Sequence, residues 1–270
     1  MKTINLFRYW NNIPEIIRLL ILFSIPVVVI SYASFVQGGW TGIFEILKIA
    51  ALFFSFIAFY VGGASLCQKY VFDRLDVVLR IFSAEHDLDF KHHGHSIFSN
   101  PGVGSTVSGE YNGFSVSMRG NFHGYQLSRR SFIVEIEDVK SQFRMLFTNK
   151  NHAFPKVDFW KTNKIPSFST FLCERGPTVK LKNADVIGLG DNLRNSHYLV
   201  TEKKNKALEL LNNGFIESLL SLKGAVYLDG EKLFYGQYKH PNNPKELTEI
   251  LDALTDSVKK INSDLGSNAQ

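Results

Sequence analysis

The chain has 270 residues and a formal net charge of +5, and 45% of its residues are hydrophobic. This composition is ordinary for a globular protein, and it excludes a disordered or collagen-like chain. The length fits one or two domains. The charges, however, are unevenly distributed, because the first 67 residues contain only six charged side chains.

Two long runs near the N-terminus, 19–44 and 49–68, contain no charged residue. About 20 apolar residues, at about 1.5 Å rise per residue, cross a hydrocarbon core of about 30 Å. We therefore expect residues 1–67 to form a membrane anchor, a transmembrane hairpin with helices at about 15–36 and 43–67. Pro26 is expected to kink the first helix without ending it.

Basic residues on both sides of the expected hairpin predict its orientation. Three basic residues precede the first helix, and Lys69, Arg74 and Arg80 follow the second. Because basic flanks stay in the cytoplasm, we expect an integral membrane protein whose termini and soluble domain are cytoplasmic. The alternative is a signal peptide cleaved after Ala33. Cleavage there would leave the location of the domain unchanged.

Residues 68–95 are expected to form a juxtamembrane helix followed by a His-rich connector. Phe72, Leu75, Leu79 and Phe82 recur at spacings of three and four, with charged residues between them, as in an amphipathic helix. Two placements stay open: the helix lies on the membrane surface, or it packs under the domain.

Residues 96–270 are expected to form the soluble domain, and two hairpin turns stand out in it. Asn112-Gly113 and Asp229-Gly230 each lie between alternating residues, and such dipeptides accept the positive φ angles of tight turns. Alternation over 132–136 predicts another strand. Further strands are expected at 142–148 and 195–201, and a long loop with short strands at 149–177.

Helical patterns follow at 203–213 and 215–222, each ended by a glycine. The last helix has the clearest start, because Asn243 can cap it, Pro244 suits its first position and Glu246 completes a capping box. Strands first and helices late predict an α+β fold with a mainly antiparallel sheet and a C-terminal helix.

Three segments carry a resemblance to known proteins: Arg-Ile-Phe-Ser-Ala-Glu-His-Asp-Leu-Asp-Phe at 80–90, the Gly-x-Tyr-x-Gly turn at 109–113, and 198–200. The chain resembles a loose group of uncharacterised bacterial membrane proteins, in which a two-helix hairpin carries a cytoplasmic α+β domain. The resemblance implies a bacterial inner membrane location and carries over no catalytic residue.

One cluster has the side chains of a metal site, with His86, His92, His93 and His95 interleaved with aspartates. Imidazoles and carboxylates are ligands of Zn²⁺ and similar ions, so these histidines are candidate metal ligands. Their spacing matches no known zinc motif. Two other interpretations stay open: a polar connector, or a segment that becomes more basic as its histidines are protonated near pH 6.

Basic residues are the candidates for lipid contact: Arg119, Arg129, Arg130, Lys203 and Lys204. Each basic residue near an anionic leaflet contributes about 1 kcal/mol of attraction. An ordinary solvated surface is the alternative interpretation, and a nucleic-acid site needs a denser patch than this domain offers.

Motifs for nucleophilic catalysis or phosphate binding are absent from the sequence. We therefore expect a non-enzymatic, membrane-anchored cytoplasmic binding module without a cofactor. Its expected partners are the lipid bilayer and its headgroups, another protein, or a second copy of the chain. The alternative hypothesis is a metal-dependent enzyme that uses 86–95.

Overall fold

The computed structural model describes residues 73–92, 103–122, 130–149, 164–173, 176–188 and 197–267, with single residues and short runs between 32 and 70. The chain divides into two compact units. One comprises Met1–Lys69 and His95–Pro101, and the other comprises Tyr70–Gly94 and Gly102–Gln270. The domain boundaries expected at 67 and 95 stay predictions.

The predicted transmembrane hairpin is wrong, because no helix among the described residues is long and apolar enough to cross a membrane. Much of the two segments predicted at about 15–36 and 43–67 lies outside the described residues. A run without charge is only one requirement for a membrane helix, because a span also needs about 20 residues in one continuous apolar helix.

Two further predictions depended on that hairpin and are corrected with it. The fold class was expected to be α+β with a transmembrane hairpin, whereas the described chain is mainly one large antiparallel sheet with a few helices. The integral location in a bacterial inner membrane, with cytoplasmic termini and domain, is likewise wrong, because it required the same spanning helices.

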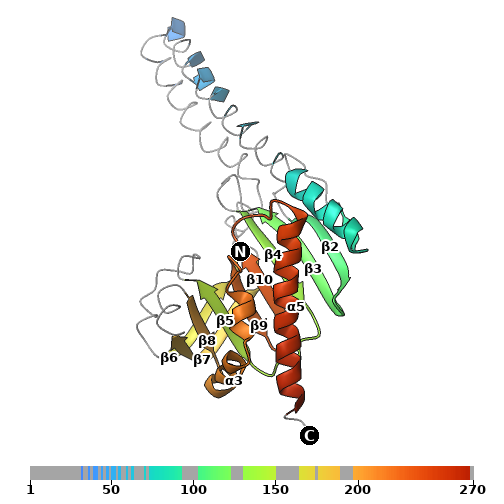
Figure 1. Ribbon diagram of the computed structural model, residues 1–270. Coiled ribbons are helices and arrows are strands. Elements are labelled where there is room, and N and C mark those ends of the chain that lie inside the picture. The colour runs from blue at the N-terminus through green and yellow to red at the C-terminus, as the bar shows by residue number, and fades with distance from the viewer. Residues whose placement is uncertain are drawn as a thin grey trace, which may run out of the picture. The chain divides into compact units, whose positions relative to one another are not determined.

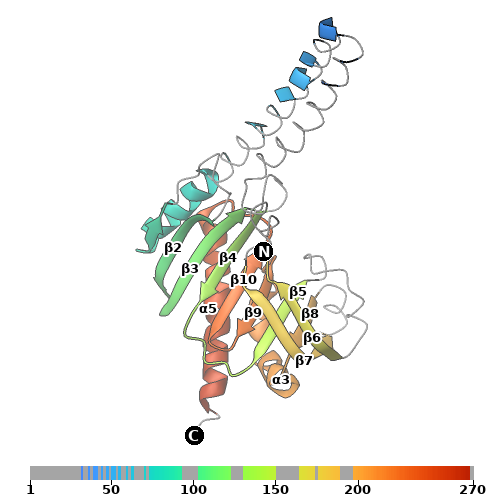
Figure 2. The same ribbon diagram turned by 180° about the vertical axis from the view of Figure 1, so that it is seen from behind.

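The second unit contains a ten-stranded sheet in the order β1-β2-β3-β4-β10-β9-β5-β8-β7-β6, and all neighbouring strands are antiparallel (Figures 1 and 2). The strands are β1 (Asp89–Lys91), β2 (Val103–Tyr111), β3 (Phe114–Phe122), β4 (Arg130–Ile136), β5 (Arg144–Asn149), β6 (Lys164–Phe171), β7 (Thr178–Gly188), β8 (His197–Thr201), β9 (Ala225–Asp229) and β10 (Lys232–Gln237). The helices are a segment at 73–85, α3 (Lys204–Asn212), α4 (Phe215–Leu219) and α5 (Pro244–Ser267).

Both predicted hairpin turns are confirmed. Asn112 and Gly113 join β2 to β3 with φ angles of 52° and 83°, and Gly230 has a φ of 69° between β9 and β10. These left-handed conformations are the ones that asparagine and glycine accept at low cost. Local turn chemistry therefore fixes both hairpins.

One face of the sheet is covered by helices, and the figures show α5 lying across it (Figures 1 and 2). A single buried cluster joins Leu79 of the 73–85 segment, Met118 and Val134 of the sheet, and Leu254 of α5, all fully buried. The segment at 73–85 thus packs under the domain, which was one of its two expected placements.

The opposite face has its own core, formed where the β6–β7 turn lies over β10. Cys173 and Leu172 pack so closely on Gly236 of β10 that a Cβ there would lie 2.5 Å from the Cys173 sulfur. The second core includes Leu146, Val179, Leu181, Val200, Tyr227 and Phe234. Burial raises the pKa of the Tyr227 hydroxyl to about 12.

The C-terminal helix begins as predicted. The Glu246 amide donates to Asn243 Oδ1 at 2.8 Å, and the Glu246 carboxylate accepts from the Asn242 amide at 2.9 Å. The first bond satisfies an amide that the first helical turn leaves without a partner, and the second holds the residue before the cap. The apolar stripe that follows, Leu247, Ile250, Leu251, Leu254, Val258 and Ile261, is buried against the sheet.

Candidate functional site

The helical segment at 73–85 has a buried apolar side and, among exposed charged residues, two exposed aliphatic side chains. Its inner side, with Leu75, Leu79 and Phe82, is at most 1% exposed. Its outer side carries Val77, which is 57% exposed, and Ile81, which is 43% exposed. One apolar side accounts for the packing on the sheet, so the outer pair has no role in the core. Exposed apolar side chains that share a helix face mark a candidate contact surface.

Tyr70 and Arg74 extend this outer surface. Arg74, Val77 and Ile81 follow one another at spacings of three and four, which places them on one side of the helical segment at 73–85, and Tyr70 is a helical residue four positions before Arg74. Tyr70 is 70% exposed and Arg74 is exposed. We name these four residues the outer stripe. An amphipathic aromatic ring, a guanidinium and two aliphatic side chains therefore share one surface.

A buried carboxylate fixes the segment to the sheet. The Asp76 side chain is 7% exposed, and its Oδ2 lies 3.0 Å from Nδ1 of His92, which follows β1. The same Nδ1 lies 3.2 Å from the Ser105 hydroxyl on β2. Because a buried carboxylate is costly without a partner, the pair with His92 stabilises the docked segment.

The Asp76, His92 and Ser105 group has the residue types of a catalytic triad but not its geometry. A triad uses one ring nitrogen towards the carboxylate and the other towards the serine. Here Nδ1 of His92 is the nitrogen in contact with both partners. This arrangement orients the ring and does not place a separate ring nitrogen against the Ser105 hydroxyl as a base.

The end of the segment is held by ring packing. His86 lies with its ring centroid 4.4 Å from Phe82 and 5.1 Å from Tyr111. The Tyr111 hydroxyl donates to Asp252 of α5 at 2.8 Å. Burial, followed by this bond, raises the pKa of Tyr111 above its ordinary value. His86 is therefore a packing residue between the segment and the hairpin turn.

A glycine makes room for the segment on the sheet. A Cβ at Gly120 of β3 would lie 2.3 Å from Leu75 and 3.3 Å from His240 Nε2. The first distance is shorter than Cβ contacts allow and the second is tight, so a larger residue would force the end of the Leu75 side chain to move and His240 to shift slightly. The close approach of 73–85 thus depends on a residue without a side chain.

The structure divides the four predicted metal ligands. His86 packs on aromatic rings and His92 contacts Asp76, while His93 and His95 lie outside the described residues. Within the described part of the chain, no group of three or more His, Cys, Asp or Glu side chains is arranged to hold a metal ion. Metal binding by the complete His-rich segment stays a prediction.

The predicted lipid-contact residues lie on different strands and loops. Arg119 is half-buried on β3, and Lys203 and Lys204 are exposed where α3 begins after β8. These strands are third and eighth in the sheet, a separation on the order of 24 Å at about 4.8 Å per strand. Arg130 is the first residue of β4, and Arg129 lies outside the described residues. The structure does not gather the described members of this set into one patch.

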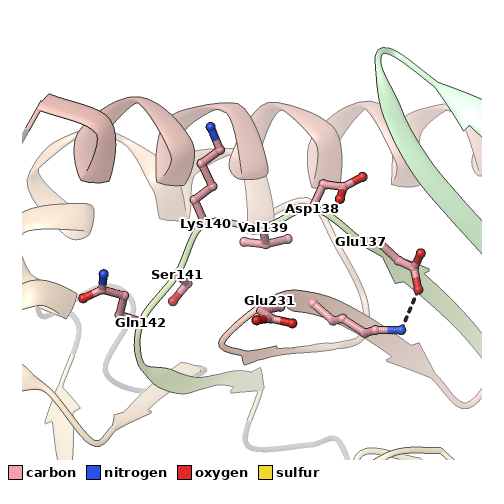
Figure 3. A pocket seen from close by; sticks show the side chains of 8 residues that line it. Glu137, Asp138, Val139, Lys140, Ser141, Gln142 and Glu231 are labelled. Carbon is pink, nitrogen blue, oxygen red and sulfur yellow. Dashed lines mark hydrogen bonds and ion pairs between the residues drawn. The ribbon is translucent and has the colours of Figure 1, made fainter. Parts of the chain in front are cut away.

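A surface cavity of about 560 Å³ lies where the β4–β5 loop crosses the β9–β10 turn (Figure 3). It is lined by Glu137, Asp138, Val139, Lys140, Ser141, Gln142, Glu231 and Lys232. The amides of Val139 and Ser141 donate to the carbonyls of Glu231 and Gly230 at 3.0 and 3.1 Å. These bonds join the loop to the turn and occupy the two amide donors.

The charges beside this cavity also pair with one another. The Lys232 ammonium donates to the carboxylates of Glu135 and Glu137, as Figure 3 shows for Glu137. Both hydrogen bonds raise the pKa of Lys232, and the bond from Lys232 lowers the pKa of Glu137. The arrangement stabilises the loop beside the β9–β10 turn.

The sequence pattern predicts the segment but not its exposed aliphatic residues. The apolar spacing at 72–82 indicates the helix, whereas nothing in that pattern points to Val77 and Ile81. Two aliphatic residues four apart on the side expected to be polar were the available signal. No comparable signal existed for Asp76 and His92, because 16 residues separate them and only the fold brings them together.

Comparisons with known proteins provide no family for the chain. No protein-family model matches it, and no curated protein matches it. Among solved structures, the crystal structure of the mycobacterial trehalose monomycolate transport factor A, TtfA, aligns over 70% of this chain and 93% of that chain. The TM-score is 0.41 and the identity is 11%, and at these values the likeness supports no functional argument.

Proposed function

We propose that the protein is a lipid-binding module that contacts anionic headgroups through the outer stripe of Tyr70, Arg74, Val77 and Ile81. The observation that carries this proposal is the exposure of Val77 and Ile81 on a helix whose other side is already buried. Transfer of such side chains from water to the boundary between headgroups and acyl chains is favourable.

The chemistry of the stripe fits this boundary. Tyrosine places an apolar ring below and a hydroxyl above the headgroup level, and Arg74 attracts anionic phosphates by about 1 kcal/mol. Asp73 and Glu85 are exposed on the same segment, so charge alone does not drive the contact. Burial of the exposed parts of Val77 and Ile81 contributes about 1.5–3 kcal/mol.

The fixed position of the segment supports its role as a binding surface. The inner side is packed in the core, and Asp76 contacts His92 at 3.0 Å. A helix that is already ordered loses little conformational entropy when it binds. Large apolar side chains are also exposed in the first unit, with Phe59 at 83% and Trp40 at 70%. Exposed apolar side chains of this kind are also suited to lipid contact.

Co-sedimentation of the full chain with phosphatidylcholine vesicles, with and without phosphatidylglycerol, tests this proposal. We expect binding to vesicles that contain phosphatidylglycerol, and about tenfold weaker binding of the Val77→Ser/Ile81→Ser variant. Arg74→Ala should weaken binding to anionic vesicles only, and salt should reduce this difference.

Leu208→Ser is the matched control, because Leu208 of α3 is an exposed leucine outside the stripe. Its vesicle affinity should equal that of the parent chain. Equal affinities of the parent and the Val77→Ser/Ile81→Ser variant would reject the stripe as the lipid contact.

A further inference from the structure

The two edges of the ten-stranded sheet differ in length. β1 has three residues, whereas β6 has eight, and among the described strands β6 pairs only with β7. A short edge strand offers few main-chain groups to a partner, while a long one is a template for another strand. The β6 edge is therefore the one suited to accept a further strand.

Only part of β6 is suited to this pairing. Pro166 lacks an amide donor and Lys164 adds a charge, and both features protect an edge. The following stretch, Ser-Phe-Ser-Thr-Phe at 167–171, contains neither proline nor charge. Phe171 at its end is 61% exposed. These five residues form the edge site.

The solvent face beside the edge site is basic. Ser167 lies opposite Lys182 and Ser169 lies opposite Lys180 in the β6–β7 pair, and all four are exposed. No acidic residue occurs in 167–171 or 178–182. The nearby Glu202 carboxylate accepts the Lys182 amide at 3.0 Å, and Asp185 lies opposite Lys164 beyond the site. The exposed Lys180 and Lys182 on β7 thus lie beside the small side chains of Ser167 and Ser169 on the edge strand.

The hairpin that carries the edge site is firmly packed on its other side. Val179 and Leu181 are at most 1% exposed, and Leu172 and Cys173 lie against Gly236. The Leu172 amide donates to the Pro177 carbonyl at 3.0 Å. An ordered edge is preorganised, so a partner strand meets a fixed row of main-chain groups.

We propose that the edge site binds an extended acidic segment of a partner protein, which adds an eleventh strand beside β6. An added strand would lie about 9–10 Å from β7. Because Ser167 and Ser169 are small, carboxylates on alternate residues of that strand can reach Lys180 and Lys182 over them. Main-chain hydrogen bonds would supply affinity, and the two ion pairs would select acidic sequences.

A fluorescein-labelled peptide of alternating valine and glutamate, titrated into the full chain, tests this proposal by anisotropy. We expect binding that weakens about tenfold or more in Lys180→Glu/Lys182→Glu, since two attractions between charges become repulsions. Lys245→Glu/Lys259→Glu is the matched control, with the same charge change at exposed positions of α5, and it should retain the parent affinity.

Amide exchange distinguishes strand addition from simple attraction of charge. The peptide should slow exchange within 167–171 of the parent chain. Absence of binding, equal affinity of both charge variants, or unchanged exchange at 167–171 would each overturn the proposal. Tighter binding of oligothymidine or of phosphatidylglycerol vesicles at the same lysines, without slower exchange, would assign the face to nucleic acid or lipid and also overturn it. The lipid contact at the outer stripe does not enter this test.

Discussion

The segment at 73–85 and α5 cover the same face of the sheet, yet their outer sides differ. Both contribute fully buried residues to one core, such as Leu79 and Leu254. The exposed positions of α5 up to residue 259 are all charged: Lys245, Glu249, Asp252, Asp256 and Lys259. The shorter segment exposes charged residues too, but it also exposes the aliphatic side chains of Val77 and Ile81.

This difference separates what folding requires from what it does not. A helix that covers a sheet needs one apolar side and is usually polar on the other, as α5 is. Apolar residues on the outer side of 73–85 add nothing to the packed core. The exposure of these residues is the observation on which the proposed lipid surface rests.

The largest effects should be equal in the two helices. Leu79→Ala and Leu254→Ala each remove a fully buried side chain from the common core, and each should lower the free energy of unfolding by about 2–5 kcal/mol. Urea unfolding measures both. A loss below about 1 kcal/mol for Leu79→Ala alone would mean that 73–85 is not part of the folded core.

Smaller effects should distinguish the polar contacts of the two helices. His92→Ala removes the ring that lies 3.0 Å from the buried Asp76, and we expect a loss of about 1–3 kcal/mol. Tyr111→Phe removes a hydrogen bond to Asp252, an exposed carboxylate of α5 that water can solvate. Its expected loss is about 1 kcal/mol.

The reverse order of these two losses, again measured by urea unfolding, would contradict the view that the Asp76–His92 pair fixes the segment. A double substitution of Asp76 and His92 to alanine should cost less than the sum of the two single changes. Additive losses would show that the two side chains do not interact in the folded protein.

Stability should also depend on pH through a buried histidine of the same face. His197 stacks on Phe147, and burial lowers its pKa. Because the unfolded chain then binds the proton more readily, stability should fall as the pH drops below the ordinary histidine pKa of about 6.5. The fall should be smaller in His197→Phe. Urea midpoints at neutral and mildly acidic pH measure it, and equal pH dependence in both proteins would exclude His197 as the cause.

The smallest effect on stability is expected on the outer stripe. Val77→Ser/Ile81→Ser changes exposed side chains only, so the free energy of unfolding should change by no more than about 0.5 kcal/mol. Thermal unfolding without lipid measures it. A loss as large as that of Leu79→Ala would show that these residues stabilise the fold.

Features that depend on a few neighbouring residues were predictable from the sequence. The turns at Asn112-Gly113 and Asp229-Gly230, the cap at Asn243 and the glycine at 214, which has a φ of 75°, all follow from local chemistry. The strand expected at 142–148 is β5 at Arg144–Asn149.

Features that depend on distant pairing were not predictable. β6 lies within the stretch at 149–177 that was predicted as a long loop with short strands, and β7 follows it, because Lys, Ser and Pro obscure the alternation there. The insertion of β10 and β9 between β4 and β5 joins segments about 90 residues apart, which no local pattern specifies. The same reason hid the Asp76–His92 contact, since the two residues lie on different elements that only the fold brings together.

Amide exchange of the full chain, with and without phosphatidylglycerol-containing vesicles, tests the comparison of the two helices most directly. The proposed lipid contact predicts slower exchange within 73–85 when vesicles are present, while exchange in α5 stays unchanged and provides an internal control. Unchanged exchange in both helices, or slower exchange in α5 alone, would contradict a lipid-binding outer stripe.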